Sequence, residues 1–298
     1  MIPQELLNWT LFAHVPQMLV LEYVFGVTVS LLVGSFLNVV VYRLPIMMDR
    51  KWQAAIAEAV NNPNGYRFPD AQENPTDEVF NLAVPRSACP HCNHQITWYE
   101  NLPVISYLFL RGKCSECHVP ISLRYPMIEL TMGLLGVLIV YLVGFSLTGL
   151  ALLLFVSTMV TLALIDFDHM ILPDSITLPF IWLGMVFHVV HILPILTVEQ
   201  SLVGAMMGYL SLWSVYWAYK LVRNKEGLGY GDFKLLAVVG AWGGALILPQ
   251  VILIAAPLFL LGVMYVHFCK GGWDTQRAAP FGPPLAIAGM MMVLWEYI

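Results

Sequence analysis

A series of long apolar runs fills most of this chain and constrains its fold more than any other feature. Runs long enough to cross a bilayer as helices lie at about 18–42, 126–144, 147–165, 175–195, 200–222, 233–249, 250–268 and 280–297. Hydrophobic residues make up 59% of the sequence, charged residues only 11%, and the mean hydropathy is +0.74. These values lie outside the range of soluble globular domains. The sequence therefore predicts an all-α polytopic membrane protein with about eight transmembrane helices.

The basic residues predict the orientation of these helices. With the segment after the first run placed inside, all 14 Lys and Arg residues fall on the cytoplasmic side, where such residues concentrate. Both termini are then outside. Residues 1–17 lack the basic start and the cleavage site of a signal peptide, so we expect them to form an outer segment before a first membrane helix at 18–42. The net charge of -5 gives no reason to expect a nucleic-acid partner.

The sizeable segment between the first two apolar runs, residues 43–125, carries four of the five cysteines. Cys89 and Cys92 form CPHC, Cys114 and Cys117 form CSEC, and 21 residues separate the two pairs. Two CxxC pairs at this distance are typical of a tetrahedral four-thiolate zinc site. Disulfides are the alternative, but thiols stay reduced in the cytoplasm. We expect a small cytoplasmic zinc-ribbon-like domain, whose zinc is structural because four sulfurs leave no open coordination position.

Asp232 is the first candidate catalytic residue, because it lies between closely spaced glycines and an apolar helix. It ends the motif GLGYGD (227–232), whose glycines allow positive φ or the close approach of another chain. An ionisable group at a membrane surface is costly and is a functional candidate by default. The structural alternative is an aspartate that caps a helix N-terminus. A second aspartate at the same membrane face favours the functional interpretation.

That second acid is Asp166, at the end of the third apolar run in the segment IDFDHMILPD (165–174). If the third helix continues past Asp166, its carboxylate points into the bundle, whereas Asp174, after Pro173, is expected to cap the fourth helix. Two carboxylates brought close at a poorly hydrated edge share a proton and titrate as a pair. One then takes a proton from water while the other donates to a scissile carbonyl. Asp166 and Asp232 therefore predict peptide hydrolysis.

Two other functions also use membrane aspartates. A Mg²⁺-dependent membrane phosphotransferase would hold its metal against a diphosphate with the same cytoplasm-facing acids, and Lys234 is the candidate for a phosphate clamp. An ion-coupled transporter would need acids near the bilayer midplane, but here the acids gather at one face. The sequence contains neither a GxSxG elbow nor an HExxH helix, so no nucleophile or metalloprotease motif competes with the aspartates.

Taken together and in order, the motifs of this chain resemble those of the bacterial type IV prepilin peptidases, the GxGD class of intramembrane aspartyl proteases. The resemblance covers nearly the whole chain from Gly34 onward, except residues 46–85. The matching stretches are GSFLNVVVYRLP (34–45), RSACPHC (86–92), ITWYENLPVISYLFLRGKCSEC (96–117), RYPMIEL (124–130), IDFDHMILPDSITLP (165–179), KEGLGYGDFKLLA (225–237) and PFGPPLAIAG (280–289).

This resemblance implies a reaction and the residues that carry it. The family cleaves the basic leader from prepilins and from the pseudopilins of type II secretion, at the cytoplasmic face of the bacterial inner membrane. Commonly it also methylates the new N-terminal amine with S-adenosylmethionine. The catalytic pair then falls on Asp166 and Asp232, and the zinc ligands on Cys89, Cys92, Cys114 and Cys117.

The methyl transfer is implied by the resemblance alone. The sequence has no GxGxxG turn that opens a helix, so it assigns no residues to S-adenosylmethionine. The cysteine-bearing segment 43–125 is where the resemblance implies this activity. Residues 126–298 are expected to form a seven-helix membrane protease domain, in contact with lipid and with the substrate.

Overall fold

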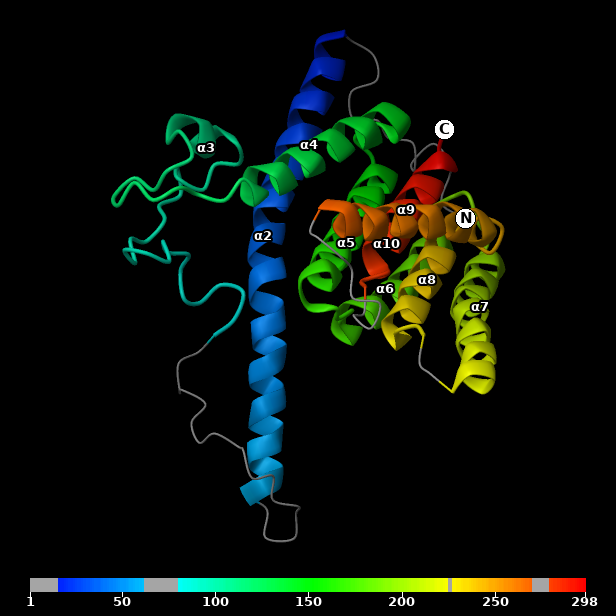
Figure 1. The fold of residues 1–298 in the computed structure, drawn as a ribbon. Helices are drawn as coiled ribbons and strands as arrows, with labels where there is room; N and C mark the ends of the chain where they lie inside the picture. The colour runs from blue at the N-terminus through cyan, green and yellow to red at the C-terminus, as the bar shows by residue number, and fades with distance from the viewer. Residues whose placement is uncertain (1–15, 62–79, 225–226, 270–278) are drawn as a thin grey trace. The chain divides into compact units, whose positions relative to one another are not determined.

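The computed structural model describes residues 16–61, 80–224, 227–269 and 279–298, and within them it contains helices, turns and two isolated β-bridges but no strand (Figure 1). Residues 1–15 of the predicted outer segment, residues 62–79 of the predicted zinc domain, and Lys225 and Glu226 of the glycine motif lie outside the described residues. The helices are α2 (Pro16–Asn61), α3 (Ile105–Phe109), α4 (Arg124–Val143), α5 (Leu147–His169), α6 (Asp174–Val189), α7 (Val198–Arg223), α8 (Tyr230–Gly243), α9 (Leu248–Cys269) and α10 (Gly282–Trp295).

The chain divides into two compact units, and the boundary passes through two helices. One unit is Leu31–Gly133, and the other joins Met1–Ser30 to Leu134–Ile298. The smaller unit contains most of α2, all of α3 and the first half of α4. The larger unit contains the helices from α5 to α10.

Each of the eight apolar runs predicted to cross the membrane overlaps mainly one helix, but the runs 175–195 and 233–249 extend past the ends of α6 and α8, at Val189 and Gly243. Four helices among the described residues are long and apolar enough to span a bilayer: α2 over Val20–Ala57, α4, α5 and α9. Two others, α6 and α10, are apolar but shorter, with 16 and 14 residues. The protein is therefore an all-helical, multi-pass membrane protein with four membrane-capable helices in its described part.

The first helix, α2, is longer than the sequence predicts. It begins at Pro16 and continues through Pro45 to Asn61, whereas the apolar pattern predicts a membrane helix that ends at 42 and a soluble domain that starts at 43. Proline removes one backbone hydrogen bond and commonly ends or kinks a helix. After Pro45, however, the sequence is rich in Met, Lys, Arg, Gln, Ala and Glu, which favour helix. The helical propensity of these residues thus continues the helix beyond the end of the apolar run.

In the smaller unit, Arg43 of α2 holds the chain that returns toward the cysteines. Its guanidinium group donates to the backbone carbonyl oxygens of Asn81 (2.9 Å), Leu82 (3.4 Å) and Pro85 (2.6 Å). The side chain is buried, and a buried charge is tolerated only when it is well hydrogen-bonded. These contacts therefore anchor the segment from residue 80 onward to the extended part of α2.

The first turns of α4 belong to the same unit and are joined to α3 by Glu129. This buried carboxylate accepts the backbone N–H of Val104 at 2.7 Å, and the Ser35 hydroxyl of α2 also donates to it. Val104 immediately precedes α3 and has a φ of 60°, a conformation that β-branched residues rarely adopt. Glu129 thus holds α3 close to the start of a membrane-capable helix.

In the larger unit, α7 and α8 pack with their backbones in direct contact. Gly204 and Gly208 form a GxxxG motif on α7, and Gly204 lies against Gly240 of α8. Such small residues let membrane helices approach closely. Next to them, the Ser201 hydroxyl donates to the carbonyl oxygen of Ala241 at 2.6 Å. This contact fixes α8, the helix that starts at the glycine motif.

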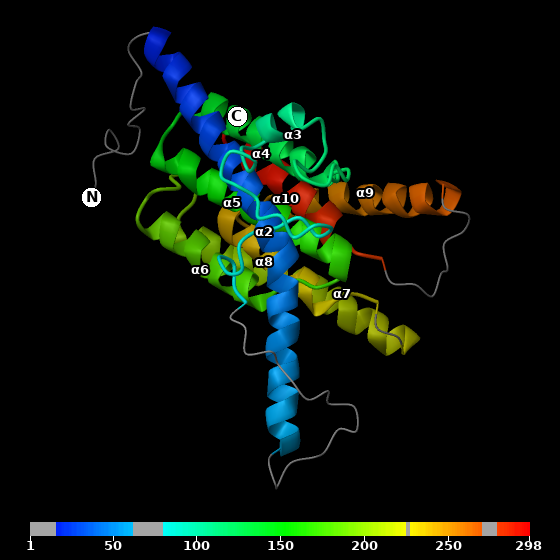
Figure 2. The same cartoon turned by 90° about the vertical axis from the view of Figure 1, so that its left-hand side faces the viewer.

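Trp242 anchors the far end of α8 in an aromatic cluster. The centroid of its ring lies 5.0 Å from that of Phe155 on α5, 5.4 Å from Phe180 and 5.5 Å from Phe187, both on α6. Its indole N–H also donates to the carbonyl oxygen of Phe180 at 3.0 Å, the partner that a buried indole requires. α5, α6 and α8 lie side by side in both views of the fold (Figure 1 and Figure 2). α8 is thus held along its length by α7 and at its end by α5 and α6.

We expect Gly204→Ala to destabilise the protein by about 1–3 kcal/mol, the usual cost of adding atoms to a well-packed core. A Cβ at this position would overlap the backbone carbonyl of Gly240, and backbone cannot rotate away as a side chain can. Gly262→Ala in α9 is the matched control, because nothing lies within 4 Å of a Cβ placed there. Thermal unfolding in detergent, followed by circular dichroism, compares the two variants. Equal unfolding midpoints would contradict the α7–α8 contact.

Candidate active site and metal centre

Asp166 lies in the last turn of α5, which ends at His169. The condition for an inward-pointing carboxylate, that this helix continues past Asp166, is therefore met. The Asp166 side chain is 6% exposed, and its Oδ2 accepts the backbone N–H of Gly282 at 3.0 Å. Its neighbours Asp168 and His169 are exposed. Asp166 is thus the acid of this turn that points into the helical unit.

Asp232 is the third residue of α8 and is 7% exposed. The N-cap of the helix is Gly229, and Asp232 lies in its first turn. Its carboxylate also accepts the backbone N–H of Gly229, which is a contact that the structural alternative, an acid at a helix N-terminus, predicts. The backbone N–H of Asp232 donates to the carbonyl oxygen of Gly229 at 3.2 Å, which closes the first turn. The glycine motif therefore starts the helix and holds the buried Asp232 side chain in its first turn.

Asp166 and Asp232 lie on two helices, α5 and α8, that both pack against α10. The Phe155–Trp242 ring contact joins α5 to α8. From this contact, Asp166 lies 11 residues further along α5 and Asp232 lies 10 residues back along α8, which is about 16 Å and about 15 Å at 1.5 Å per residue. The two carboxylates also interact electrostatically. The structure therefore brings together the two acids that the sequence singles out.

Two further contacts join the segments that carry these acids. The Lys234 Nζ of α8 lies 2.6 Å from Asp174 Oδ1 of α6, and a Cβ on Gly231 would lie 2.8 Å from Leu172. The prediction that Asp174 caps α6 is wrong, because Pro173 holds the N-cap position and Asp174 pairs with the lysine instead. This pairing also engages the amine that a phosphotransferase would need as a phosphate clamp.

Gly282, the first residue of α10, is a site residue that the sequence analysis does not identify. Its N–H donates to Asp166, and a Cβ placed on it would lie 2.5 Å from Asp166 Oδ2. The available signal is the motif PFGPP, in which a glycine stands beside prolines at a helix start. No local pattern connects this glycine to an acid 116 positions earlier.

We expect Gly282→Ala to lower peptide cleavage by roughly a hundredfold, the loss typical of a reacting group that is misplaced by about 1 Å. The added methyl group would push the Asp166 carboxylate and disturb the N–H that orients it. Gly289→Ala on the same helix is the control, because its Cβ would come equally close to a buried methyl group of Val239 but to no carboxylate. Cleavage rates per folded molecule separate the two. Full activity of Gly282→Ala would remove this glycine from the site.

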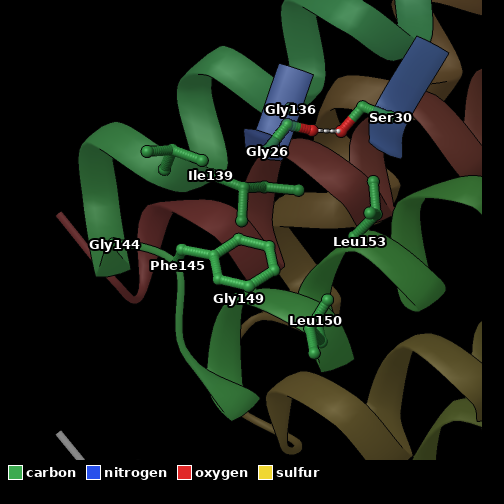
Figure 3. A pocket seen from close by; sticks show the side chains of 10 residues that line it. Gly26, Ser30, Gly136, Ile139, Gly144, Phe145, Gly149, Leu150 and Leu153 are labelled. Carbon is green, nitrogen blue, oxygen red and sulfur yellow. Dashed lines mark hydrogen bonds between the residues drawn. The ribbon is translucent and has the colours of Figure 1, made fainter. Parts of the chain in front are cut away.

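An apolar pocket in the larger unit is distinct from the two acids (Figure 3). Its lining includes Gly26, Ser30, Gly136, Phe145 and Leu150. Leu150 lies 16 residues before Asp166 on α5, about 24 Å along the helix axis. The Ser30 hydroxyl donates to the carbonyl oxygen of Gly26 at 2.8 Å, so the polar groups at this pocket satisfy each other. The pocket takes no part in the candidate chemistry.

The four predicted zinc ligands converge in the smaller unit. The Sγ atoms of Cys89, Cys92, Cys114 and Cys117 lie within 4.8 Å of one another. Cys89 Sγ is 3.7 Å from Cys117 Sγ, and Cys92 Sγ is 3.9 Å from Cys114 Sγ. Sulfurs at the corners of a tetrahedron with Zn–S bonds of about 2.3 Å are about 3.8 Å apart. The four thiols are free of disulfides, and they fit a tetrahedral metal ion such as zinc.

The surroundings of these thiols favour a bound cation. The backbone N–H groups of Cys92 and His91 lower the pKa of the Cys89 thiol to about 6. At Cys117 the N–H of Val119 lowers the pKa, but burial and hydrogen bonds with the other three sulfurs outweigh it and raise the pKa to about 12. Four sulfurs this close can all be thiolates only around a positive ion, which displaces their protons.

The two cysteine pairs share one backbone design. The N–H of Cys89 donates to the carbonyl oxygen of His94, and the N–H of Cys114 donates to that of Val119, both at 2.9 Å. The residues that follow the two pairs, Asn93 and His118, each have a φ of 58°. The backbone therefore turns back directly after the second cysteine of each pair. Each pair therefore forms the same knuckle, which presents two sulfurs on one side.

Glu100 connects the two knuckles through its partly buried carboxylate. It accepts hydrogen bonds from the Ser115 hydroxyl (2.5 Å), from the Thr97 hydroxyl (2.6 Å) and N–H (2.8 Å), and it contacts His94 Nε2 at 3.2 Å. These bonds, that of Ser115 foremost, lower the pKa of Glu100 to about 2. The stability that they contribute is therefore present above the ordinary glutamate pKa of about 4.3 and is lost as the pH falls toward 2.

Comparison with known proteins finds relatives over most of the chain. Two family profiles match, the Bacterial Peptidase A24 N-terminal domain over residues 28–143 and the Type IV leader peptidase family over residues 153–266. A prepilin leader peptidase/N-methyltransferase of Stutzerimonas stutzeri is 47% identical over 91% of this chain and 89% of its own length. Proteins of the same name are 45% identical in Pseudomonas aeruginosa, over 90% of this chain and 89% of theirs, and in Pseudomonas putida, over 96% and 94%. No solved structure matches the chain.

Proposed function

This chain belongs to the prepilin leader peptidase/N-methyltransferase family, and we propose that it cleaves leader peptides from type IV prepilins and type II secretion pseudopilins. As a bifunctional enzyme, it then methylates the N-terminal residue that cleavage exposes. The observation that carries the hydrolytic half is the pair of buried carboxylates, Asp166 and Asp232, at the same end of α5 and α8.

In the proposed mechanism, these two carboxylates share one proton, because two like charges at a poorly hydrated position cannot both form cheaply. The ionised carboxylate takes a proton from water while the water oxygen attacks the scissile carbonyl carbon, and the protonated carboxylate donates to the carbonyl oxygen, which gives a gem-diol. The proton taken from water then passes to the amine nitrogen as the C–N bond breaks, and the second carboxylate takes a proton back from a diol hydroxyl, which restores the shared proton. Gly282 supports this chemistry, since its N–H holds Asp166 Oδ2 in one orientation.

We place this site at the cytoplasmic face of the bacterial inner membrane. The basic residues support this orientation, because those of the described part lie between Arg43 and the start of α4, at the end of α7 or near the start of α8. A cytoplasmic site would meet the basic leader of a prepilin before the rest of the substrate. We further propose that the eight apolar runs all lie in the membrane, so that residues 126–298 form the protease domain.

For the region 43–125, we propose a cytoplasmic domain that holds one structural zinc ion in the four-cysteine site. When bound, the ion supplies four metal–sulfur bonds that tie the two knuckles together. Glu100 orients the knuckles from behind, as outer groups commonly do in metal sites. We assign the S-adenosylmethionine-dependent methyl transfer to this region, on the strength of the family's two-part name and the presence of a second compact unit.

One experiment tests both activities. The purified chain is incubated with a prepilin and with S-adenosylmethionine that carries a labelled methyl group, and cleavage and methyl transfer are scored separately. We expect a shortened pilin that carries the label at its new N-terminus. An uncleaved substrate would overturn the peptidase assignment, and a cleaved but unlabelled product would overturn the methyl transfer. Brief EDTA treatment distinguishes the phosphotransferase, which requires Mg²⁺, from an aspartate pair that does not.

A further inference from the structure

The short helix α3 presents its apolar side outward. Ile105, Leu108 and Phe109 are 50%, 69% and 84% exposed. Their spacing of three and four residues puts them on one face of the helix. The other face packs inward, where Tyr107 contacts Gly112 and its hydroxyl donates to the carbonyl oxygen of Ile121. A helix on the surface of a water-soluble unit turns its apolar face toward the core and its polar face toward water. The outward apolar face of α3 therefore fits an apolar partner.

The depth at which α3 lies identifies that partner. Val104, the residue before α3, donates its N–H to Glu129 of α4 at 2.7 Å. Glu129 is five residues from Arg124, where the membrane-capable helix α4 begins, so it lies at most about 7.5 Å along this helix. α4 has 20 residues, about the number needed to cross the hydrocarbon core. The start of α3 is therefore within the depth at which interfacial helices bury their apolar faces, about 5–10 Å into the boundary between headgroups and acyl chains.

The residues that flank α3 match a membrane interface in both chemistry and charge. Trp98 and Tyr99, in the turn before α3, are strongly exposed, and these two residue types are enriched at the interface of membranes. Arg111 and Lys113, directly after α3, are exposed and basic, which suits the anionic headgroups of phospholipids. The exposed apolar surface also continues onto α4, where Met127 and Leu130 face outward.

We propose that α3 is an interfacial membrane anchor, which inserts Ile105, Leu108 and Phe109 into the lipid beside the start of α4. The partner is the phospholipid bilayer itself. The insertion keeps the four-cysteine site at the membrane surface, because α3 ends five residues before Cys114. This goes beyond the proposed activities, since neither peptide hydrolysis nor metal binding requires an apolar helix on the outside of the zinc-binding unit.

The test uses the full-length protein in nanodiscs of phosphatidylethanolamine and phosphatidylglycerol. The photoreactive residue p-benzoylphenylalanine replaces Phe109, and in a second variant Leu108, both of which are too exposed for the change to disturb packing. The control is Trp52 on α2, which is also aromatic and 68% exposed. It follows Asp49, Arg50 and Lys51, and we expect it to lie in water. Zinc content and leader cleavage verify that each variant is folded.

After illumination, mass spectrometry identifies what each position has captured. We expect phospholipid adducts at 109 and 108 in a yield several-fold above that at 52. Adducts to another segment of this chain, or to a second copy, would show that protein covers the α3 face and would overturn the proposal. So would equal lipid yields at 109 and 52, or no adduct at either α3 position. If one α3 variant does not fold, the other decides between these outcomes.

Discussion

Asp166→Asn and Asp232→Asn are each expected to lower leader-peptide cleavage by at least about a hundredfold, and up to about 10⁴-fold, the range over which general acid–base groups accelerate reactions. An asparagine keeps the size of the side chain but can neither take a proton from water nor share one with the other acid. Both positions are buried at one end of α5 and α8, and a neutral amide there removes a buried charge. The variants should therefore remain folded and inserted while they lose hydrolysis.

Asp168→Asn is the matched control for this experiment, since it makes the same chemical change at an exposed position in the same turn of α5. We expect near-normal cleavage from it. The double variant at 166 and 232 should be about as inactive as either single variant, because residues that act as one unit give non-additive losses. Rates are measured with purified, folded protein and one prepilin. Retained cleavage in either single variant would exclude that residue from the chemistry.

Cys89→Ser and Cys114→Ser are expected to abolish zinc binding and to unfold the region around the knuckles. A serine hydroxyl is a poor replacement for a thiolate, and the remaining three sulfurs cannot complete the tetrahedron. The binding of structural zinc contributes on the order of 10 kcal/mol in isolated zinc-finger peptides, as much as the whole net stability of a typical domain. Bound metal is counted by elemental analysis, and the state of the knuckles by protease sensitivity of residues 80–123.

Cys269→Ser provides the comparison, because this fifth cysteine lies outside both CxxC pairs. The Cys269→Ser variant should bind zinc as the unmodified protein does.

Methyl transfer is expected to fall when zinc is lost from the cysteine variants, since we assign this activity to the same region. Leader cleavage should be affected less, because the acids at 166 and 232 belong to the other compact unit. Active enzyme that contains no zinc would contradict a structural role for the metal.

Much of the site could be predicted from sequence because its chemistry depends on local patterns. The CxxC spacing alone identifies four ligands, and the structure brings their sulfurs within 4.8 Å. Likewise, Asp166 and Asp232 are recognisable because acids at the ends of apolar runs are costly and rare. In both cases the residue type and the neighbouring sequence carry the information, with no need for knowledge of distant contacts.

The contacts that position these groups could not be predicted, because they join residues far apart in the chain. Nothing near Gly282 indicates that its N–H reaches Asp166. Likewise, the sequence around Asp174 predicts a helix cap, whereas its partner is Lys234, 60 positions later. The predicted end of the first helix, at residue 42, was wrong for a different reason. Hydropathy reports where a lipid-embedded segment ends, but a helix ends where its backbone hydrogen bonds do, and the residues after Pro45 continue to favour them.

The 46 residues of α2 have one more consequence. At 1.5 Å per residue the helix is about 69 Å long, well beyond the roughly 40–45 Å of a whole bilayer with its headgroups. Its apolar half has no water to compete for the peptide groups, while residues 49–55 of its polar half are exposed to water. Amide hydrogens along this single helix should therefore exchange with deuterium at very different rates, fast near Asn61 and extremely slowly near Gly34.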